Sequence, residues 1–193
     1  MAAPCKHYGF PISARVPLSQ NQDTPEAIAA AVGRGVAGFA QYYAVNRPDL
    51  LIVLGDRFEM FAAALGAVPF NIPILHLHGG ELTEGAMDDR FRHALTKLSH
   101  LHGVATEVYR QRVIQMGEEP WRVLCCGALS LDNFMAIPRL SRKDLEEQFA
   151  LDLSQPPLLV TLHPTTSEYE NTGAQVDALL GALRLLNMPV IFT

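Results

Sequence analysis

Cysteine is scarce in this chain, and its spacing suits no structural task. The 193 residues include three cysteines, Cys5 and the adjacent pair Cys125 and Cys126. Zinc sites need ligand pairs at characteristic separations, and disulfide frameworks need an even set of separated cysteines. Neither pattern is present, so we expect a protein of a reducing compartment, the cytoplasm.

Long apolar runs and an excess of basic residues are missing too. No stretch reaches the roughly 20 apolar residues that cross a bilayer, and the N-terminus lacks the apolar core of a signal peptide. The net charge of −5 argues against a nonspecific nucleic-acid binder. There are no internal repeats or low-complexity tracts. We therefore expect a globular protein that binds neither nucleic acid nor membrane.

The sequence does have a regular alternation of short apolar runs and helical patterns, with helix-start signals such as Asp23-Thr24-Pro25-Glu26. The pattern predicts strands at 50–54, 72–78, 104–106, 123–126, 158–162 and 190–192, and a short one at 12–16. It predicts helices at 25–45, 58–68, 88–101, 107–116, 142–149 and 173–186. This order implies right-handed βαβ units, and hence an α/β fold with a Rossmann-like, doubly wound parallel sheet.

The alternation changes character near residue 130. The pattern predicts one α/β domain over residues 1–130, then a hinge and the start of a second domain within residues 131–193. Two strands and one helix are too few for a complete second domain and leave an open sheet edge. We therefore expect the sequence to be part of a longer protein. Apolar surface left open in such a part favours self-association, so we also expect a homo-oligomer.

Polar clusters follow three of the predicted strands. Gly55-Asp56-Arg57 follows the first central strand, His78-Gly79-Gly80-Glu81 the next, and His163-Pro164-Thr165-Thr166 the strand that opens the second unit. In open parallel sheets, ligands bind beyond the carboxyl ends of the strands. The glycine pair permits close backbone approach, and helix N-termini can hold phosphate oxygens. The three clusters together predict a ligand site at this edge.

The acidic residues of this region have structural explanations as well as catalytic ones. Asp56 can cap the helix that follows it, and Glu81 can be a solvated loop residue. Asp88 and Asp89 stand at a helix start, where the helix dipole favours acidic side chains. Taken singly, each residue is explained without a function.

Basic neighbours favour the catalytic explanation. Arg92 lies four residues after Asp88, and His93 lies four after Asp89, so each pair shares one face of a helix. Carboxylates near basic groups suit the abstraction of a proton beside a departing anion.

The histidines support a rival hypothesis, a metal-dependent hydrolase. His76 and His78 share one face of a predicted strand, and three more histidines follow along the chain, namely His93, His100 and His102. Alternate histidines on a strand are more often packed or hydrogen-bonded, and the spacing fixes no third ligand. We therefore predict that no metal is bound.

Three segments resemble the hydrolysing UDP-N-acetylglucosamine 2-epimerases of sialic-acid biosynthesis. They are LLIVLGDRFEM, NIPILHLHGGELTEGAMDDRFRHALTKLSHLH and VTLHPTT, in the order of that family, and LSQNQDTPEAIAAAVGRGVAGFA resembles the stretch before the first. The similarity runs from about Ser13 to the end of the chain. The family has two Rossmann-like domains that face a cleft, the GT-B arrangement. The resemblance thus implies that the chain is truncated at both ends, without the first strand and helix of the first domain and most of the second.

The resemblance also implies a reaction. Loss of the C2 proton and anti loss of UDP give a glycal, and water then adds to yield free N-acetylmannosamine. Asp56 and Asp88 fall on positions of the acid and base, and His163 on that of a residue that steadies the departing diphosphate. Glu81 is a further catalytic candidate. The implied partner is a UDP-sugar, with no cofactor, and we expect it to contact the side chains and turn nearby, namely Arg57, His78, Gly79, Gly80, Asp89, Arg92 and His93.

One position departs from the family pattern. Several relatives have a catalytic glutamate where this chain has His78, immediately ahead of the glycine pair. Glu81 or Glu84 can substitute for it, His78 can perform the task itself, or this branch can act on another sugar. UDP-N,N′-diacetylbacillosamine, used by similar enzymes in legionaminic-acid synthesis, is the alternative substrate. A noncatalytic remnant is the remaining hypothesis.

Overall fold

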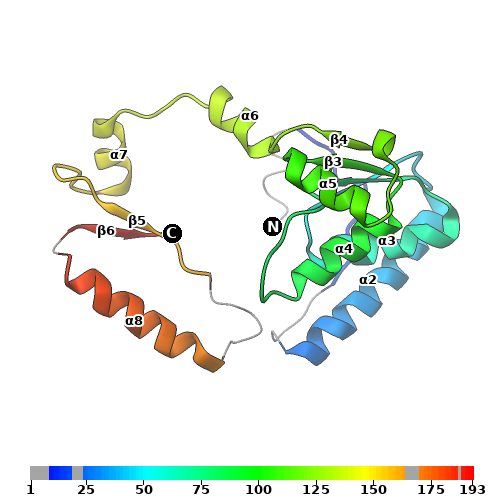
Figure 1. The fold of residues 1–193 in the computed structure, drawn as a ribbon, viewed down its shortest axis with the longest axis horizontal. Coiled ribbons are helices and arrows are strands. Elements are labelled where there is room, and N and C mark those ends of the chain that lie inside the picture. Colours follow the sequence, from blue (N-terminus) through cyan, green and yellow to red (C-terminus); the bar gives the residue numbers. More distant parts are fainter. Residues whose placement is uncertain (1–8, 19–23, 164–169, 187) are drawn as a thin grey trace. The chain divides into compact units, whose positions relative to one another are not determined.

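The computed structural model describes residues 9–18, 24–163, 170–186 and 188–193 (Figure 1). The chain forms two compact units. The first comprises Met1–Thr83 and Asp88–Leu129, and the second comprises Glu84–Met87 and Ser130–Thr193. Each unit has a parallel sheet of its own.

The sheet of the first unit has four parallel strands in chain order. They are β1 (Leu51–Leu54), β2 (Ile74–Leu77), β3 (Leu101–Val104) and β4 (Val123–Cys125). In the register of the sheet, Val53 of β1 lies beside His76 of β2, and His76 lies beside His102 of β3. Parallel strands in this order bring all their carboxyl ends to one edge of the sheet.

Helices α3 (Phe58–Ala67), α4 (Asp88–Leu98) and α5 (Glu107–Gln115) connect these strands and pack on the sheet. Helix α2 (Pro25–Val45) precedes β1 and packs against α3 (Figure 1). Short 3-10 turns, η1 (Val68–Phe70) and η2 (Pro120–Arg122), lead into β2 and β4. Right-handed connections between strands in consecutive order place their helices on the same side of the sheet.

The side chains of the strands show which face is covered. Val53, Ile74 and Val104 are buried in the core, whereas Ile52 is 56% exposed and Leu124 is 65% exposed. Because alternate residues of a strand point to opposite faces, the buried set belongs to the helix side of the sheet. The described residues thus leave apolar side chains uncovered on the other face.

Helix α2 begins as its sequence predicts. The Thr24 hydroxyl accepts a hydrogen bond from the Ala27 amide at 3.2 Å, and Pro25 occupies the first turn. The glycines of α2 allow close packing at two positions. A Cβ at Gly35 would lie 2.8 Å from the Ala62 Cβ of α3, and one at Gly38 would lie 2.6 Å from Val16.

The second unit holds a parallel pair, β5 (Leu158–Val160) and β6 (Val190–Phe192), and the helices α7 (Arg142–Phe149) and α8 (Thr172–Arg184). Helix α6 (Leu129–Ala136) leads into it. Ser141 and Asp144 form a capping box at the start of α7. None of the unit's described residues is fully buried, so its side chains form no closed core of their own.

The structure differs from several of the predicted elements. Residues 11–16 form no strand. Strand β3 begins at Leu101, three residues before the predicted start, because His100 is already bonded to Ile74 of β2. The His100 amide donates to the Ile74 carbonyl, and the His100 ring Nδ1 accepts a hydrogen bond from the Ile74 amide. Helix α6 lies in the segment predicted to be a hinge. Among the helices of the described residues, none has both the length and the apolar character needed to cross a bilayer.

Candidate active site at the carboxyl ends of β1 and β2

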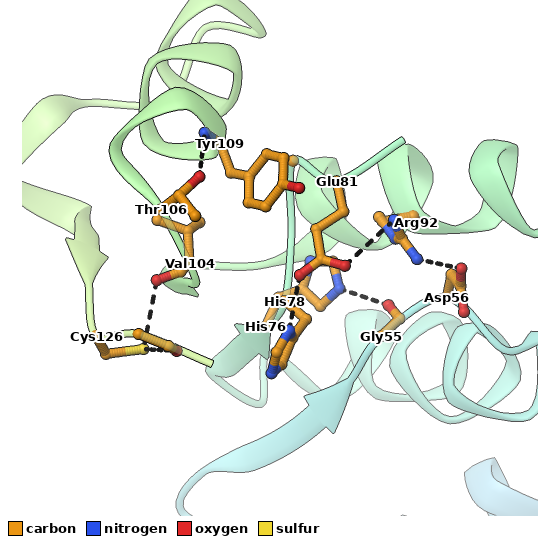
Figure 2. A network of polar contacts seen from close by, with 12 residues as sticks. Gly55, Asp56, His76, His78, Glu81, Arg92, Val104, Thr106, Tyr109 and Cys126 are labelled. Carbon is orange, nitrogen blue, oxygen red and sulfur yellow. Dashed lines mark hydrogen bonds and ion pairs between the residues drawn. The ribbon is translucent and has the colours of Figure 1, made fainter. Parts of the chain in front are cut away.

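Four polar side chains from three segments form one network in the first unit (Figure 2). Asp56 follows β1, His78 and Glu81 follow β2, and Arg92 comes from α4. Arg92 donates from Nη2 to Asp56 Oδ2, and its Nη1 lies 3.8 Å from Glu81 Oε2. The other oxygen of Glu81 lies 2.7 Å from His78 Nδ1. The guanidinium thus links two carboxylates, and one of these carboxylates holds an imidazole.

Arg92 is the most buried member of the network. Its side chain is 8% exposed, and the Asp56 carboxylate and the Glu81 carboxylate surround it with negative charge. A buried charge is stable only when it is paired, so the guanidinium requires both acids. Its planar fork of N–H groups suits contact with two carboxylates at once. The predicted partner on the same helix, Asp88, has no ion pair with Arg92 among the described residues, because the guanidinium is directed to the strand ends.

The turn after β2 directs His78 toward Glu81. His78 has a left-handed backbone, with φ of +62°, and its amide donates to the Gly103 carbonyl at 2.8 Å. Strand β2 therefore ends at Leu77, and His78 does not continue the strand as predicted. Non-glycine residues rarely adopt this conformation, and it costs about 1 kcal/mol or more. Such strain is typical of functional positions.

The glycine pair fixes this turn against α5. Gly80 has φ of +79°, and a Cβ there would lie 2.6 Å from the Tyr109 carbonyl oxygen. Arg112 of α5 donates from Nη1 to the Gly80 carbonyl. A side chain at this position would therefore displace the turn that carries His78 and Glu81.

Buried His76 lies beneath this network. Its Nε2 is 2.7 Å from the Gly55 carbonyl oxygen and its Nδ1 is 3.2 Å from Thr96 Oγ1. Burial lowers the pKa of His76 to about 4, although the Gly55 carbonyl acts in the opposite direction. Both ring nitrogens are therefore occupied by protein groups. The described residues contain no cluster of three or more histidine, cysteine or acidic side chains arranged for a metal ion.

Asp89 and His93 form a separate pair on α4. Asp89 accepts a hydrogen bond from the Thr83 amide at 3.0 Å and lies 3.5 Å from His93 Nε2. Asp89 therefore holds the loop before α4 as well as its helical neighbour. A substrate contact for these two residues stays a prediction.

Arg57 is exposed and pairs with its neighbour in the chain. Its guanidinium lies 2.9 Å from Glu59. This hydrogen bond raises the pKa of Arg57 above its ordinary value, and the charges of Asp88 and Asp56 act in the same direction. Arg57 and Asp88 therefore lie near enough for their charges to interact.

Two candidates belong to the second unit. His163 is exposed and follows the β5 region, and Glu84 lies in the short segment grouped with that unit. Pro164, Thr165 and Thr166 lie outside the described residues. The roles of His163 and Glu84 stay predictions.

Two residues that support the network were not predicted from the sequence. Thr96 of α4 contacts His76, and its spacing of four residues from Arg92 was an available signal. Arg112, which holds Gly80, lies 32 residues further along the chain, and no local pattern reveals that contact.

The chemistry of the network follows from its composition. Carboxylates and an imidazole within hydrogen-bond distance can accept and return protons, and the guanidinium stabilises negative charge beside them. Of the predicted residues of the first unit, Asp56, His78, Glu81 and Arg92 form this network, and the roles of the other members stay predictions.

Comparison with known proteins identifies related sequences. The sequence model of the family described as UDP-N-acetylglucosamine 2-epimerase matches residues 2–193. The chain is 36% identical over 185 residues to a GDP/UDP-N,N′-diacetylbacillosamine 2-epimerase (hydrolyzing) of Campylobacter jejuni, covering 95% of this chain and 48% of the relative. It is 33% identical over 175 residues to a UDP-N-acetylglucosamine 2-epimerase of Neisseria meningitidis, covering 90% of this chain and 46% of that protein.

Solved structures give the same fold. A Methanocaldococcus jannaschii UDP-GlcNAc 2-epimerase in complex with UDP-GlcNAc and UDP matches with a TM-score of 0.80 at 16% identity, over 98% of this chain and 52% of that chain. A Neisseria meningitidis UDP-GlcNAc 2-epimerase bound to UDP-GlcNAc matches with a TM-score of 0.74 at 17% identity in the structural alignment, over 98% of this chain and 54% of that chain. This chain thus spans about half the length of the relatives that it matches. Its sequence and its GT-B type α/β fold place it in the UDP-N-acetylglucosamine 2-epimerase family.

Proposed function

We propose that this chain carries catalytic residues of a hydrolysing UDP-sugar 2-epimerase. The observation that supports the proposal most directly is the network of Asp56, Arg92, Glu81 and His78 at the carboxyl ends of β1 and β2. This is where open parallel sheets bind their ligands. The names of the related enzymes point to the same reaction class.

The reaction has two steps. A base removes the proton from C2 of the sugar, the C1–O bond breaks, and its electron pair leaves with UDP, so that a C1–C2 double bond remains. Water then adds to this glycal. Its hydroxyl group bonds to C1, and C2 receives a proton on the face opposite to the one that lost its proton. The products are UDP and a free 2-epimeric sugar, N-acetylmannosamine when the substrate is UDP-N-acetylglucosamine.

The two proton transfers need an acid and a base on the two sides of the sugar ring. We assign them to Asp56 and Asp88, with Glu81 as the third carboxylate. Arg92 keeps Asp56 and Glu81 in place and compensates their charge. His78, held by Glu81 at 2.7 Å, supplies an imidazole to the same surface.

The departing diphosphate needs positive charge and hydrogen-bond donors. His163 is our candidate for this task, and Arg57 and the Gly79-Gly80 backbone are further candidates. Arg57 is suited to an anion because its guanidinium is exposed. Asp89 and His93 complete the proposed substrate contacts.

Two sugars fit this chemistry, UDP-N-acetylglucosamine and UDP-N,N′-diacetylbacillosamine. In both sugars UDP is the leaving group on C1, and the adjacent carbon C2 is the one that is epimerised. We take the first as the substrate and the second as its alternative.

We place the enzyme in the cytoplasm, because its cysteines are few and their spacing suits no disulfide framework. We propose a homo-oligomer, because many apolar side chains are exposed, such as Ile52 and Leu124.

Product analysis tests the proposal. The complete gene product that contains this chain is incubated with each UDP-sugar, and UDP and the free sugar are identified by mass spectrometry and chromatography. We expect equal amounts of UDP and 2-epimeric free sugar from one of the two substrates. Release of the unepimerised sugar would indicate simple hydrolysis, and no release from either would favour a noncatalytic remnant.

A further inference from the structure

One buried imidazole contacts all three segments that carry the network. His76 is fully buried on the helix side of the sheet. It touches the Gly55-Asp56 turn, the Gly79-Gly80 turn and helix α4, and Figure 2 shows it behind Glu81 and beside Gly55. Its ring makes no hydrogen bond to a charged side chain among the described residues.

The hydrogen bond to Gly55 fixes the protonation of the ring. A carbonyl oxygen accepts only, so at 2.7 Å Nε2 must carry the hydrogen and donate it to Gly55. The ring is neutral because burial disfavours its charged form, so Nδ1 is left as an acceptor. This bond holds the backbone of the residue directly before Asp56.

The acceptor nitrogen connects the ring to α4. Thr96 Oγ1 lies 3.2 Å from His76 Nδ1 and 3.1 Å from the Arg92 carbonyl oxygen, and its single hydroxyl proton can be shared between these two acceptors. Thr96 is itself fully buried. The turn of α4 that carries Arg92 is therefore tied to the imidazole.

The glycine turn rests on the same ring. A Cβ at Gly79 would lie 3.0 Å from His76 Nδ1 and 3.2 Å from Thr96 Oγ1. The backbone between His78 and Glu81 therefore lies against the imidazole edge. A larger or displaced side chain at position 76 would move this turn.

We propose that His76 is a positioning residue, which fixes the relative placement of Asp56, Glu81 and Arg92 through its contacts with Gly55, Gly79 and Thr96. The kinetic part of its test rests on the function proposed above. An ordinary core histidine would contribute stability alone. A positioning residue affects turnover more than it affects substrate affinity, because misplacing a reacting group by about 1 Å can cost about 100-fold in rate.

The fold offers a matched control. His102 lies beside His76 in the register of the sheet and is equally buried. Its Nε2 is 3.3 Å from Glu118, which also pairs with Lys97, so its contacts lead away from the network. Burial lowers the pKa of His102 as well. The two histidines thus share burial and strand context but differ in what they contact.

The experiment compares His76→Leu, His76→Gln, Thr96→Val and His102→Leu in the complete gene product, with kcat, KM and thermal unfolding measured for each. We expect His76→Leu to lower kcat about 100-fold with little change in KM. His76→Gln recovers part of this loss, because its amide can donate to Gly55, and Thr96→Val costs about fivefold. His102→Leu lowers the unfolding temperature and leaves kcat within about twofold.

Equal losses of kcat in His76→Leu and His102→Leu, or unchanged kcat in His76→Leu, would overturn the proposal. A readout without turnover separates it from the proposed function. The side-chain N–H signals of Arg92 in ¹⁵N NMR are expected to shift in His76→Leu and to stay unchanged in His102→Leu. If the wild type releases no UDP, the proposed reaction fails, and these signals alone decide whether His76 positions Arg92.

Discussion

Arg92 donates a hydrogen bond to the Asp56 carboxylate across 36 positions of sequence, from a helix to the end of a neighbouring strand. The pair is possible because β1 and β2 are adjacent and parallel, and because α4 packs on β2 and on α3, the helix that follows β1. Glu81 and His78 extend the same contact chain at the end of β2. The network therefore depends on the topology of the sheet.

Asp56→Asn tests the carboxylate closest to Arg92. The amide keeps the size of the side chain but can neither accept a proton nor balance the guanidinium charge. We expect turnover to fall by about 100-fold to 10,000-fold. Steady-state assays of UDP release measure it. Asp49→Asn is the control, because Asp49 is exposed and has no partner among the described residues; equal effects of the two changes would remove Asp56 from the site.

Arg92→Lys tests whether the shape of the cation matters. Lysine keeps the charge but has no planar fork, so it cannot serve both Asp56 and Glu81 as the guanidinium does. We expect kcat/KM to fall about tenfold or more and the unfolding temperature to drop. The control Arg90→Lys changes an exposed residue of the same helix turn. Wild-type kinetics in Arg92→Lys would show that charge alone suffices.

His78 and Glu81 are expected to act as a unit. His78→Asn keeps a side chain that tolerates a positive φ, and Glu81→Gln removes the charge that faces the imidazole. Each change should lower turnover without unfolding the protein. Because the two groups are in contact, the double variant should lose less than the product of the two single losses. Strictly multiplicative losses in a double-mutant cycle would contradict this.

The sequence predicted much of this arrangement and missed specific parts. The apolar runs before Gly55 and His78 predicted β1 and β2, and the strand-end rule brought Asp56 and Glu81 to one edge. The left-handed turn at His78 was not predictable, because it depends on the Gly103 carbonyl of the next strand. Helix spacing favoured Asp88 as the partner of Arg92, whereas the tertiary fold supplies Asp56.

Other differences have similar causes. Strand β3 was predicted too late, since its start depends on the hydrogen bond from the His100 amide to the Ile74 carbonyl and not on apolar character. Helix α6 was missed because the change of pattern near residue 130 suggested a hinge. His76 was considered as a metal ligand, and its contacts with Gly55 and Thr96 exist only in the folded chain.

Stability should depend on pH through His76. The folded protein keeps this ring neutral down to its pKa of about 4, whereas the unfolded chain takes up a proton below about 6.5. The unfolded state therefore binds more protons between these values, and the free energy of unfolding rises with pH across that window. The contribution is on the order of 3 kcal/mol.

Urea unfolding at pH 4 to 7.5 measures this effect as a difference between the wild type and His76→Leu. The advantage of the wild type should be larger at neutral pH than at pH 4. A difference that is independent of pH would mean that His76 is not held neutral.

Two glycines of α2 should respond oppositely to alanine. Gly33 has nothing within 4 Å of its added Cβ, so Gly33→Ala should raise the free energy of unfolding by about 0.5–1 kcal/mol. Gly35 contacts Leu18 and Ala62, so Gly35→Ala should lower it by about 1–3 kcal/mol. Chemical denaturation distinguishes them. Equal effects would contradict the packing of α2 on α3.

These residues are proposed to remove and return the C2 proton of a UDP-sugar. Proton NMR of the complete gene product with UDP-N-acetylglucosamine in heavy water tests it most directly, with UDP-N,N′-diacetylbacillosamine in a second sample. We predict release of UDP together with a free 2-epimeric sugar that carries deuterium at C2, and loss of both in Asp56→Asn. Release of UDP with the original C2 hydrogen retained, or no release from either sugar, would contradict the account.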